Sequence, residues 1–199
     1  MTEWKLFDGD VPHVSTAEFH AHRERAPHLE QPEHRARLLA TAELVRKAAA
    51  PMSTFCDLGC GDGGLLSLVQ DNFADAWGYD FAPANEPAWA ERGVDAELAD
   101  VFNNPGRDWD VDLGRVVAVT EVLEHLADPH GVLRWLAGSE DVRTLVCSSP
   151  HNEDHRSHDE CHAWAWDTAG YVKLVEDAGF KVLEQRLEGR FQLIRAEVA

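Results

Sequence analysis

The stretch Phe55-Cys56-Asp57-Leu58-Gly59-Cys60-Gly61-Asp62-Gly63-Gly64-Leu65-Leu66 decides the fold of this chain. Its first residues continue an apolar run that predicts a buried strand over 54–58, and three glycines at a spacing of two residues follow. Glycine tolerates positive φ and lets the backbone approach a ligand closely. The helix that we expect over 64–72 offers free N–H groups at its start. The stretch therefore predicts a strand, a ligand-binding turn and a helix, although a tight turn without a ligand would need the same glycines.

Short apolar runs alternate with helical patterns on both sides of this stretch. We expect helices over 33–49, 86–92, 130–137 and 167–178, and further strands over 76–79, 94–99, 115–120, 144–147, 181–187 and 191–198. Alternation of this kind predicts an α/β fold with a doubly wound, mostly parallel sheet. The last two strands are separated by Glu188-Gly189-Arg190 alone, which predicts an antiparallel hairpin. Residues 1–33 show no periodicity, so we expect an arm that packs on a single domain.

The charge and the composition narrow the choice of partners. The chain has 199 residues with 18 Lys and Arg against 36 Asp and Glu, a formal net charge of −18. Nucleic acids and anionic membranes are bound through Lys and Arg, so this balance argues against both as partners. The start of the sequence resembles no signal peptide, and no apolar run is long enough to span a membrane. With four scattered cysteines, we expect a cytoplasmic protein with reduced thiols.

Three acidic residues follow three consecutive predicted strands. Asp57 lies at the end of the first strand, Asp80 follows the second and Asp100 follows the third. In open α/β sheets the carboxyl ends of the strands line the ligand crevice, where an acid can accept both ribose hydroxyls. The third glycine comes one residue earlier than in the Gly-x-Gly-x-x-Gly loops that hold a pyrophosphate. The pattern therefore favours a nucleoside ligand without a pyrophosphate.

These motifs resemble the class I S-adenosylmethionine-dependent methyltransferases over residues 53–199. The motifs that carry the resemblance, in order along the chain, are 57–63, Tyr79-Asp80, 98–101, 119–129 and Ala178-Gly179-Phe180. The resemblance implies a Rossmann-like seven-stranded sheet with an antiparallel last strand, and S-adenosyl-L-methionine as cofactor. By position, it implies that the cofactor contacts Asp57, Gly59, Gly61, Gly63, Asp80, Phe81, Asp100 and Val101.

Two further clusters point to the acceptor side. Glu121, Glu124 and His125 would share a face if a helix began after the fourth strand, and His162 lies in a histidine-rich stretch over 150–166. In one interpretation His125 or His162 is a general base, with Glu121 beside it. In another, the cluster resembles the metal-dependent small-RNA terminal 2′-O-methyltransferases, which implies Glu121, Glu124, His125 and His162 as ligands of a divalent metal ion. Ubiquinone-pathway O-methyltransferases carry a similar segment, and a solvated polar loop is the third interpretation.

The sequence thus predicts an S-adenosylmethionine-dependent methyltransferase that methylates oxygen on a small-molecule acceptor. The alternatives are a metal-dependent 2′-O-methyltransferase acting on RNA or a nucleotide, and a non-catalytic cofactor-binding member of the fold. Residues 1–52 would contribute an arm and a helix to the acceptor site and its lid. Trp4, Phe7, Trp164 and Trp166 could form an apolar lid.

Overall fold

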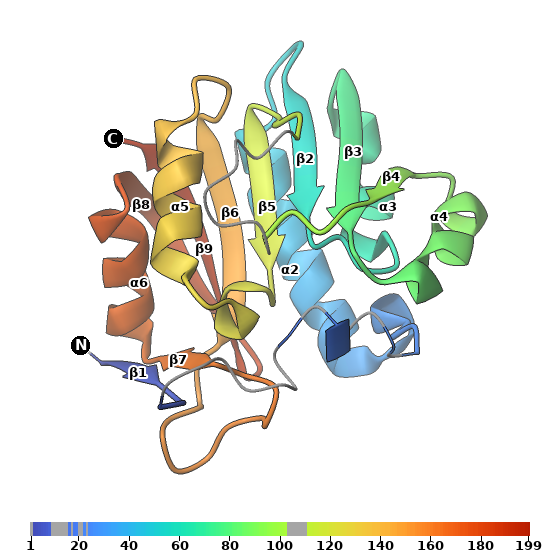
Figure 1. Cartoon of the computed structure of the whole chain (residues 1–199). Helices are drawn as coiled ribbons and strands as arrows, with labels where there is room; N and C mark the ends of the chain where they lie inside the picture. The colour runs from blue at the N-terminus through green and yellow to red at the C-terminus, as the bar shows by residue number, and fades with distance from the viewer. Residues whose placement is uncertain (1, 9–15, 17, 20–21, 23, 103–110) are drawn as a thin grey trace.

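The computed structural model describes residues 2–8, 16, 18–19, 22, 24–102 and 111–199. Its centre is a seven-stranded sheet with the strand order β4-β3-β2-β5-β6-β9-β8 (Figure 1). Strands β2 to β6 are parallel, whereas β9 runs antiparallel to both β6 and β8. The strands are β2 (Thr54–Leu58), β3 (Asp75–Asp80), β4 (Asp95–Leu98), β5 (Val116–Thr120), β6 (Thr144–Pro150), β8 (Phe180–Glu188) and β9 (Phe191–Val198). The predicted α/β fold and its antiparallel last strand are confirmed.

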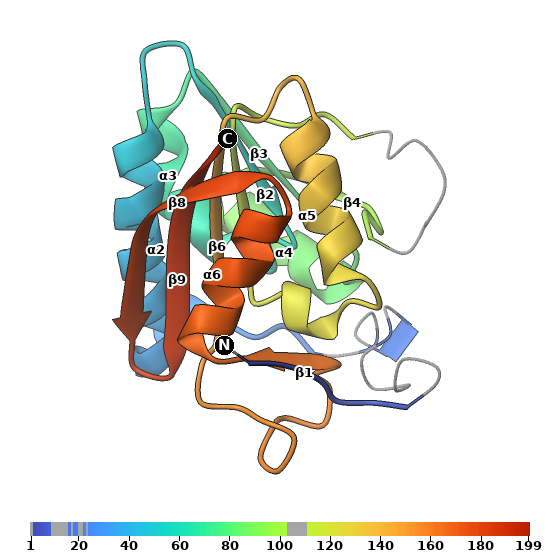
Figure 2. The same cartoon turned by 90° about the vertical axis from the view of Figure 1, so that its left-hand side faces the viewer.

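Helices cover both faces of the sheet. Figure 2 shows α2 and α3 on one face and α5 and α6 on the other. The α-helices are α2 (Pro32–Ala48), α3 (Gly64–Val69), α4 (Glu86–Arg92), α5 (Pro129–Gly138) and α6 (Thr168–Asp177), and the 3-10 turns are η2 (His28–Glu30), η3 (Gln70–Asn72), η4 (Pro83–Asn85) and η5 (Leu123–His125). Side-chain caps define the starts of α5 and α6, where Asp128 accepts from the Gly131 N–H and Asp167 from the Gly170 N–H.

The two helical layers bury separate apolar cores against the sheet. One core joins α5 and α6 to the sheet through residues such as Leu133, Leu136 and Tyr171, all fully buried. The other joins α2 and α3 through Leu44 and Leu66, also fully buried. Buried on both faces, β5 is apolar over Val116–Val119, as expected for the central strand of a parallel sheet. Each helix in the described part of the chain is too short or too polar to span a lipid bilayer.

A second, two-stranded sheet ties the start of the chain to the loop after β6. Strand β1 (Glu3–Lys5) pairs antiparallel with β7 (Trp164–Trp166), and the two lie together below the main sheet (Figure 1). The Trp166 indole N–H donates to the Glu3 carboxylate at 2.6 Å. The sequence pattern predicted an irregular arm here, because three-residue strands carry no periodicity that can be recognised.

The segment after β5 does not form the α-helix on which one prediction depended. An α-helix beginning at Glu121 was the premise for placing Glu121, Glu124 and His125 on one helix face. The structure instead has a turn in which Glu121 adopts a left-handed φ of 57°, followed by the short η5. The chain leaves the sheet edge abruptly here, while the Glu121 N–H stays bonded to the Ser148 carbonyl of β6 at 3.0 Å. The true α5 starts only at Pro129.

Candidate functional site

A cavity of about 680 Å³ lies at the carboxyl ends of the parallel strands. Its volume is within the range of small-molecule sites, roughly 300–1,000 Å³. Ten of the predicted site residues line it: Asp57, Gly59, Gly61, Asp80, Phe81, Asp100, Glu121, Glu124, His125 and His162. Gly63 and Val101 do not line it. Val101 packs into the core beside α5, and Gly63 faces Val94, whose Cγ2 atom would lie 2.7 Å from a Cβ added at Gly63.

Asp80 organises the glycine loop from the end of β3. One carboxylate oxygen accepts from the Gly61 N–H at 2.9 Å, and the other accepts from the Ala82 N–H at 2.9 Å and the Asn85 side-chain amide at 3.0 Å. The Gly61 carbonyl in turn accepts from the Trp89 indole N–H at 2.8 Å. These bonds hold the loop open toward the cavity, and a carboxylate has lone pairs left for ligand hydroxyls.

Asp57 lies at the end of β2 with almost no exposure to solvent. It is 1% exposed, and its Oδ1 atom has no hydrogen-bond partner among the described residues. Burial, with the nearby Asp80 charge, raises the pKa of Asp57 to about 7. A buried acceptor without a donor is costly unless a ligand supplies one. Asp57 is therefore suited to an ammonium or other donor group in the cavity.

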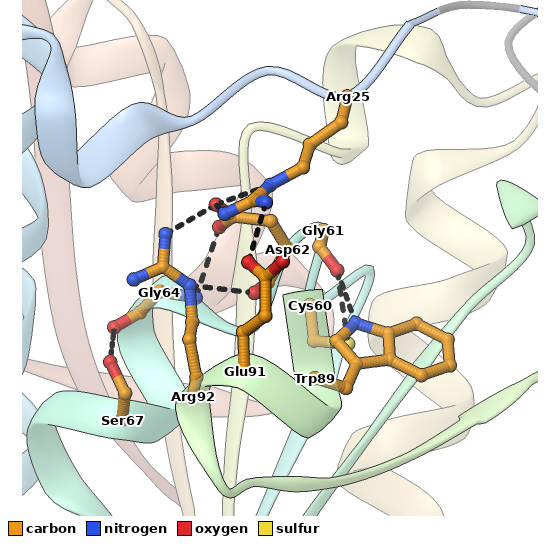
Figure 3. A network of polar contacts seen from close by, with 9 residues as sticks. All are labelled: Arg25, Cys60, Gly61, Asp62, Gly64, Ser67, Trp89, Glu91 and Arg92. Atoms are coloured by element: carbon orange, nitrogen blue, oxygen red, sulfur yellow. Dashed lines mark hydrogen bonds and ion pairs between the residues drawn. The ribbon is translucent and has the colours of Figure 1, made fainter. Parts of the chain in front are cut away.

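A second acid of the loop, Asp62, is held by two arginines (Figure 3). Its carboxylate accepts from Arg92 at 2.6 Å and from Arg25 at 3.2 Å, and its backbone carbonyl accepts from Arg92 at 3.0 Å. Arg25 reaches the loop from the arm before α2 and also pairs with Glu91 at 3.1 Å. The arm is thus fastened directly to the glycine loop, which the sequence pattern did not reveal because the partners are 37 residues apart.

Two glutamates lie together at the end of β5. Glu121 accepts from the Ser148 hydroxyl at 2.7 Å. Glu124 is 1% exposed, and neither of its carboxylate oxygens has a hydrogen-bond partner among the described residues. Burial, followed by the charge of Glu121, raises the pKa of Glu124 well above its usual range. Burial also raises the pKa of Glu121, against the opposing charge of Arg37.

Two histidines from different segments meet beside the glutamates. The ring centroids of His125 and His162 are 4.8 Å apart. The Nδ1 atom of His125 lies 2.9 Å from the Cys161 carbonyl, and that of His162 lies 2.6 Å from the Glu153 carboxylate. Because both partners are acceptors, each Nδ1 carries the proton, and Nε2 is the basic nitrogen of the neutral ring. His125, Cys161 and His162 also have possible metal-ligand atoms within 4.8 Å of one another.

Other lining residues were not predicted. They include Arg37 and His34 of α2 and Arg190 of the β8–β9 turn. The arm also lines the cavity, through Thr16, Glu24, Ala26 and His28. The four predicted lid aromatics Trp4, Phe7, Trp164 and Trp166 are absent from its lining; Phe7 contacts Trp164 edge-on and Trp166 is fully buried below the sheet.

Comparisons with known proteins agree with this arrangement. A family model described as a methyltransferase domain matches residues 23–185. No curated protein matches this chain by sequence. The solved structure of the N-methyltransferase NodS from Bradyrhizobium japonicum WM9, in complex with S-adenosyl-L-homocysteine, superposes with a TM-score of 0.70 at 15% identity. The match covers 92% of this chain and 96% of that chain.

Two other structures show the same fold. Magnesium protoporphyrin IX methyltransferase (ChlM) from Synechocystis PCC 6803 with bound S-adenosylmethionine has a TM-score of 0.62 at 17% identity, covering 92% of this chain and 90% of that chain. The methyltransferase domain of bacterial CtHen1 has a TM-score of 0.63 at 19% identity, and the match covers 82% of this chain and 97% of that chain. The family match spans most of the chain and contains all ten of the predicted residues that line the cavity. The chain therefore belongs to the class I S-adenosylmethionine-dependent methyltransferases.

Proposed function

We propose that the protein binds S-adenosylmethionine in this cavity, at the glycine loop, and methylates an oxygen atom of a small-molecule acceptor that binds beside the histidine pair. The observation that carries the proposal is the convergence of Asp57, Asp80 and the glycine loop with His125 and His162 in one cavity. The acidic net charge of −18 favours a small acceptor over a polyanion.

The residues divide into two groups along the cavity. At the cofactor end, Asp80 and Asp100 would accept from the ribose hydroxyls and the adenine edge, and Asp57 from the amino group of the methionine moiety. Gly59 and Gly61 would let the backbone approach the cofactor closely, and Phe81 would contact its nucleoside part. When bound, the cofactor supplies a methyl group on a cationic sulfur.

At the acceptor end, the histidines can take up a proton. Methylation of a hydroxyl would form a bond between its oxygen and the methyl carbon while the bond from that carbon to the sulfur breaks, so S-adenosylhomocysteine is released and the hydroxyl proton must go to a base. His125 and His162 each present a basic Nε2 atom, since their Nδ1 atoms are bonded to the Cys161 carbonyl and to Glu153. We infer that one of the pair accepts the acceptor proton and that the other orients the hydroxyl.

Calorimetry and turnover test the two halves of the proposal separately. Titration with S-adenosylhomocysteine should show one-site binding, and no binding at millimolar ligand would contradict the cofactor assignment. With a phenol, catechol, carboxylic acid and amine panel, release of S-adenosylhomocysteine should be fastest for a hydroxyl acceptor. The variants His125→Asn and His162→Asn should keep cofactor affinity, and one of them should lose about 10²–10⁴-fold in rate.

A metal-assisted version of this reaction is the second candidate. Three features favour a divalent cation: Glu124 has two buried carboxylate oxygens without a described partner, acceptors orient both histidines through Nδ1, and His125, Cys161 and His162 have possible ligand atoms within 4.8 Å of one another, a group that does not include the two glutamates. Metal-ligating histidines commonly have such an acceptor behind them. Glu121, Glu124, His125 and His162 would hold the ion, which would lower the pKa of an acceptor hydroxyl.

Elemental analysis and chelation distinguish the two versions. Bound manganese, zinc or another divalent ion in the purified protein, together with loss of activity in EDTA and recovery on adding that ion, would support the metal. Full activity in excess EDTA would leave the histidine pair as the proton acceptor without an ion.

A further inference from the structure

The walls of the cavity carry a strong excess of acidic groups. Among the described residues that line it, ten are Asp or Glu and two are Arg. Part of this charge is compensated, since two arginines pair with Asp62 and three N–H bonds satisfy the Asp80 carboxylate. The remaining acids give the cavity a negative field, which attracts cationic ligands and repels anions.

The acids at the acceptor end differ in whether they have a partner. Glu121 accepts from the Ser148 hydroxyl, and Glu153 bonds with His162 at 2.6 Å. Glu124, in contrast, is 1% exposed, and neither of its carboxylate oxygens has a hydrogen-bond partner among the described residues. It lines the cavity, so a ligand there can reach it. A buried acceptor of this kind is costly unless a ligand brings a donor to it.

The groups around Glu124 make a cation the matching donor. Burial, then the charge of Glu121, raises the pKa of Glu124, and the charge of Glu153 adds to this rise. The Arg37 charge opposes the rise, but Glu124 has no ion-pair partner within the part of the chain that the structure describes. A positively charged donor would be attracted by these acids together, and charge-assisted hydrogen bonds are stronger than neutral ones.

The arrangement of the glutamates favours an organic cation over a metal ion. The ligands of a divalent ion have to converge on one point, roughly 2.0–2.6 Å from it. The described ligand atoms that lie within 4.8 Å of one another belong to His125, Cys161 and His162, and neither Glu121 nor Glu124 is part of that group. An ammonium group needs no such convergence, since each of its three N–H groups can donate to a separate acceptor.

We propose that the acceptor carries a protonated amine in addition to its hydroxyl group, and that Glu124, with Glu121 beside it, binds this ammonium. The inference rests on the proposed function, which brings the hydroxyl to the histidine pair, and it names the substrate class: an amino alcohol or a phenolic amine. Bound in this way, the amine stays protonated. It then has no lone pair with which to attack the methyl group, so the oxygen is the nucleophile.

Calorimetry with two small probes of similar shape tests the contact. Protein saturated with S-adenosylhomocysteine, which occupies the amine site proposed at Asp57, is titrated in EDTA with benzylamine, protonated at neutral pH, and with uncharged benzyl alcohol. The wild type should prefer benzylamine by about tenfold or more. Glu124→Gln should abolish this preference without weakening benzyl alcohol or S-adenosylhomocysteine. Equal affinities for the two probes in the wild type, or binding of neither, would overturn the proposal.

Two further variants keep the result interpretable. Glu160→Gln changes an exposed acid of the loop between β6 and β7 and should behave like the wild type. Thermal unfolding shows whether Glu124→Gln folds. If it does not, Glu121→Gln provides the comparison, because it should reduce the preference for benzylamine. A preference that is unchanged in the folded variant of this pair would also overturn the proposal.

A manganese titration without EDTA separates the two kinds of cation. If Glu124→Gln lowers the affinity for manganese and leaves the preference for benzylamine unchanged, the carboxylate belongs to a metal site and the proposal is overturned. Failure of the wild type to bind S-adenosylhomocysteine would refute the proposed function alone. The same two probes, titrated into free Asp57→Asn protein with and without Glu124→Gln, would then still test Glu124.

Discussion

Gly59 and Gly61 adopt the same left-handed backbone, with φ of 79° and 55°, but a methyl group would meet different surroundings at each. A Cβ at Gly59 would lie 2.5 Å from Val122 Cγ2, whereas a Cβ at Gly61 meets no described atom within 4 Å. Gly59 is therefore required by packing. The space beside Gly61 belongs to the cavity, where a ligand would use it.

This difference predicts that alanine at Gly59 mainly lowers stability, whereas alanine at Gly61 mainly weakens cofactor binding. Gly59→Ala should destabilise the fold by about 2–4 kcal/mol, from backbone strain together with the clash. Gly61→Ala should cost about 1–2 kcal/mol from strain alone but weaken S-adenosylhomocysteine binding more than tenfold. Denaturant unfolding and calorimetry measure the two effects. Unchanged cofactor affinity in Gly61→Ala would show that the ligand does not approach this backbone.

Asp57 predicts an unusual dependence of stability on pH. Its pKa is about 7 in the folded protein against an ordinary 3.8, because burial disfavours the charged form. Between these values the unfolded chain releases the proton while the folded chain retains it, so the contribution of Asp57 to stability is lost as the pH rises from 3.8 to 7 and stays constant above.

The variant Asp57→Asn should remove this loss. At pH 8 it should unfold with a free energy higher by up to roughly 4 kcal/mol, and the gain should vanish near pH 4. The same variant should bind S-adenosylhomocysteine more weakly. Denaturant midpoints measured across this pH range provide the check, and a gain independent of pH would contradict the assignment.

Replacing Asp80 should weaken cofactor binding while lowering the stability of the fold only to a limited extent. Asp80→Ala removes the acceptor for the Gly61 N–H as well as the proposed ribose contact, so S-adenosylhomocysteine affinity should fall by roughly 1–3 kcal/mol. Asp71→Ala, at an exposed position after α3, is the matched control. Equal affinity of the Asp80 variant and this control in calorimetry would remove Asp80 from the site.

Sequence patterns identified most of these side chains but missed Arg37. An acid or glycine at the end of a predicted strand is placed by topology alone, which is why Asp57, Asp80 and Gly61 could be anticipated. Arg37 stands beside Leu38 in an amphipathic helix, where arginine ordinarily marks the solvent side. Its burial depends on the position of Phe191, which is 154 residues later in the sequence.

At the level of elements, regular structure was predictable and the turns that build the site were not. The helix over 86–92 and the strand over 54–58 were anticipated with the bounds that the structure gives. The turn after β5 was not, because the left-handed φ of Glu121 depends on a bond to Ser148 of the neighbouring strand. Strained residues of this kind concentrate at functional sites.

The contact of Arg25 with Asp62 predicts a kinetic effect of the arm. Arg25→Ala removes one of the two arginines that hold the loop acid, so the arm should leave the cavity more often. A partly exposed pair contributes about 1 kcal/mol or less, which corresponds to cofactor release up to about fivefold faster. Stopped-flow fluorescence can follow this, since Trp89 contacts Gly61.

The release rate of Arg25→Ala has to be compared with that of a second arginine variant in which no contact to the loop is lost. Arg35→Ala, an exposed arginine of α2, should leave the release rate unchanged. Equal rates for Arg25→Ala and Arg35→Ala would mean that the arm does not govern release, whereas a large loss of thermal stability in Arg25→Ala would assign the contact to folding.

At the scale of the whole molecule, the net charge of −18 predicts weak contact with polyanions. A labelled single-stranded RNA should show no saturable binding by fluorescence anisotropy at physiological salt, with or without S-adenosylhomocysteine. A small basic protein used as a positive control should bind under the same conditions. Saturable micromolar binding that falls with added salt would instead favour an RNA acceptor.

The strand order of the main sheet also constrains how the molecule is made. Strand β9 lies inside the sheet, between β6 and β8, although it comes after both in the sequence. During synthesis β9 leaves the ribosome after the other six strands of this sheet. Until then β8 has no connection to the other strands, and β6 keeps an unpaired edge. Chaperones or self-association would act on that exposed edge in the nascent chain. Removing residues 191–199 should therefore yield aggregation rather than a shorter folded enzyme.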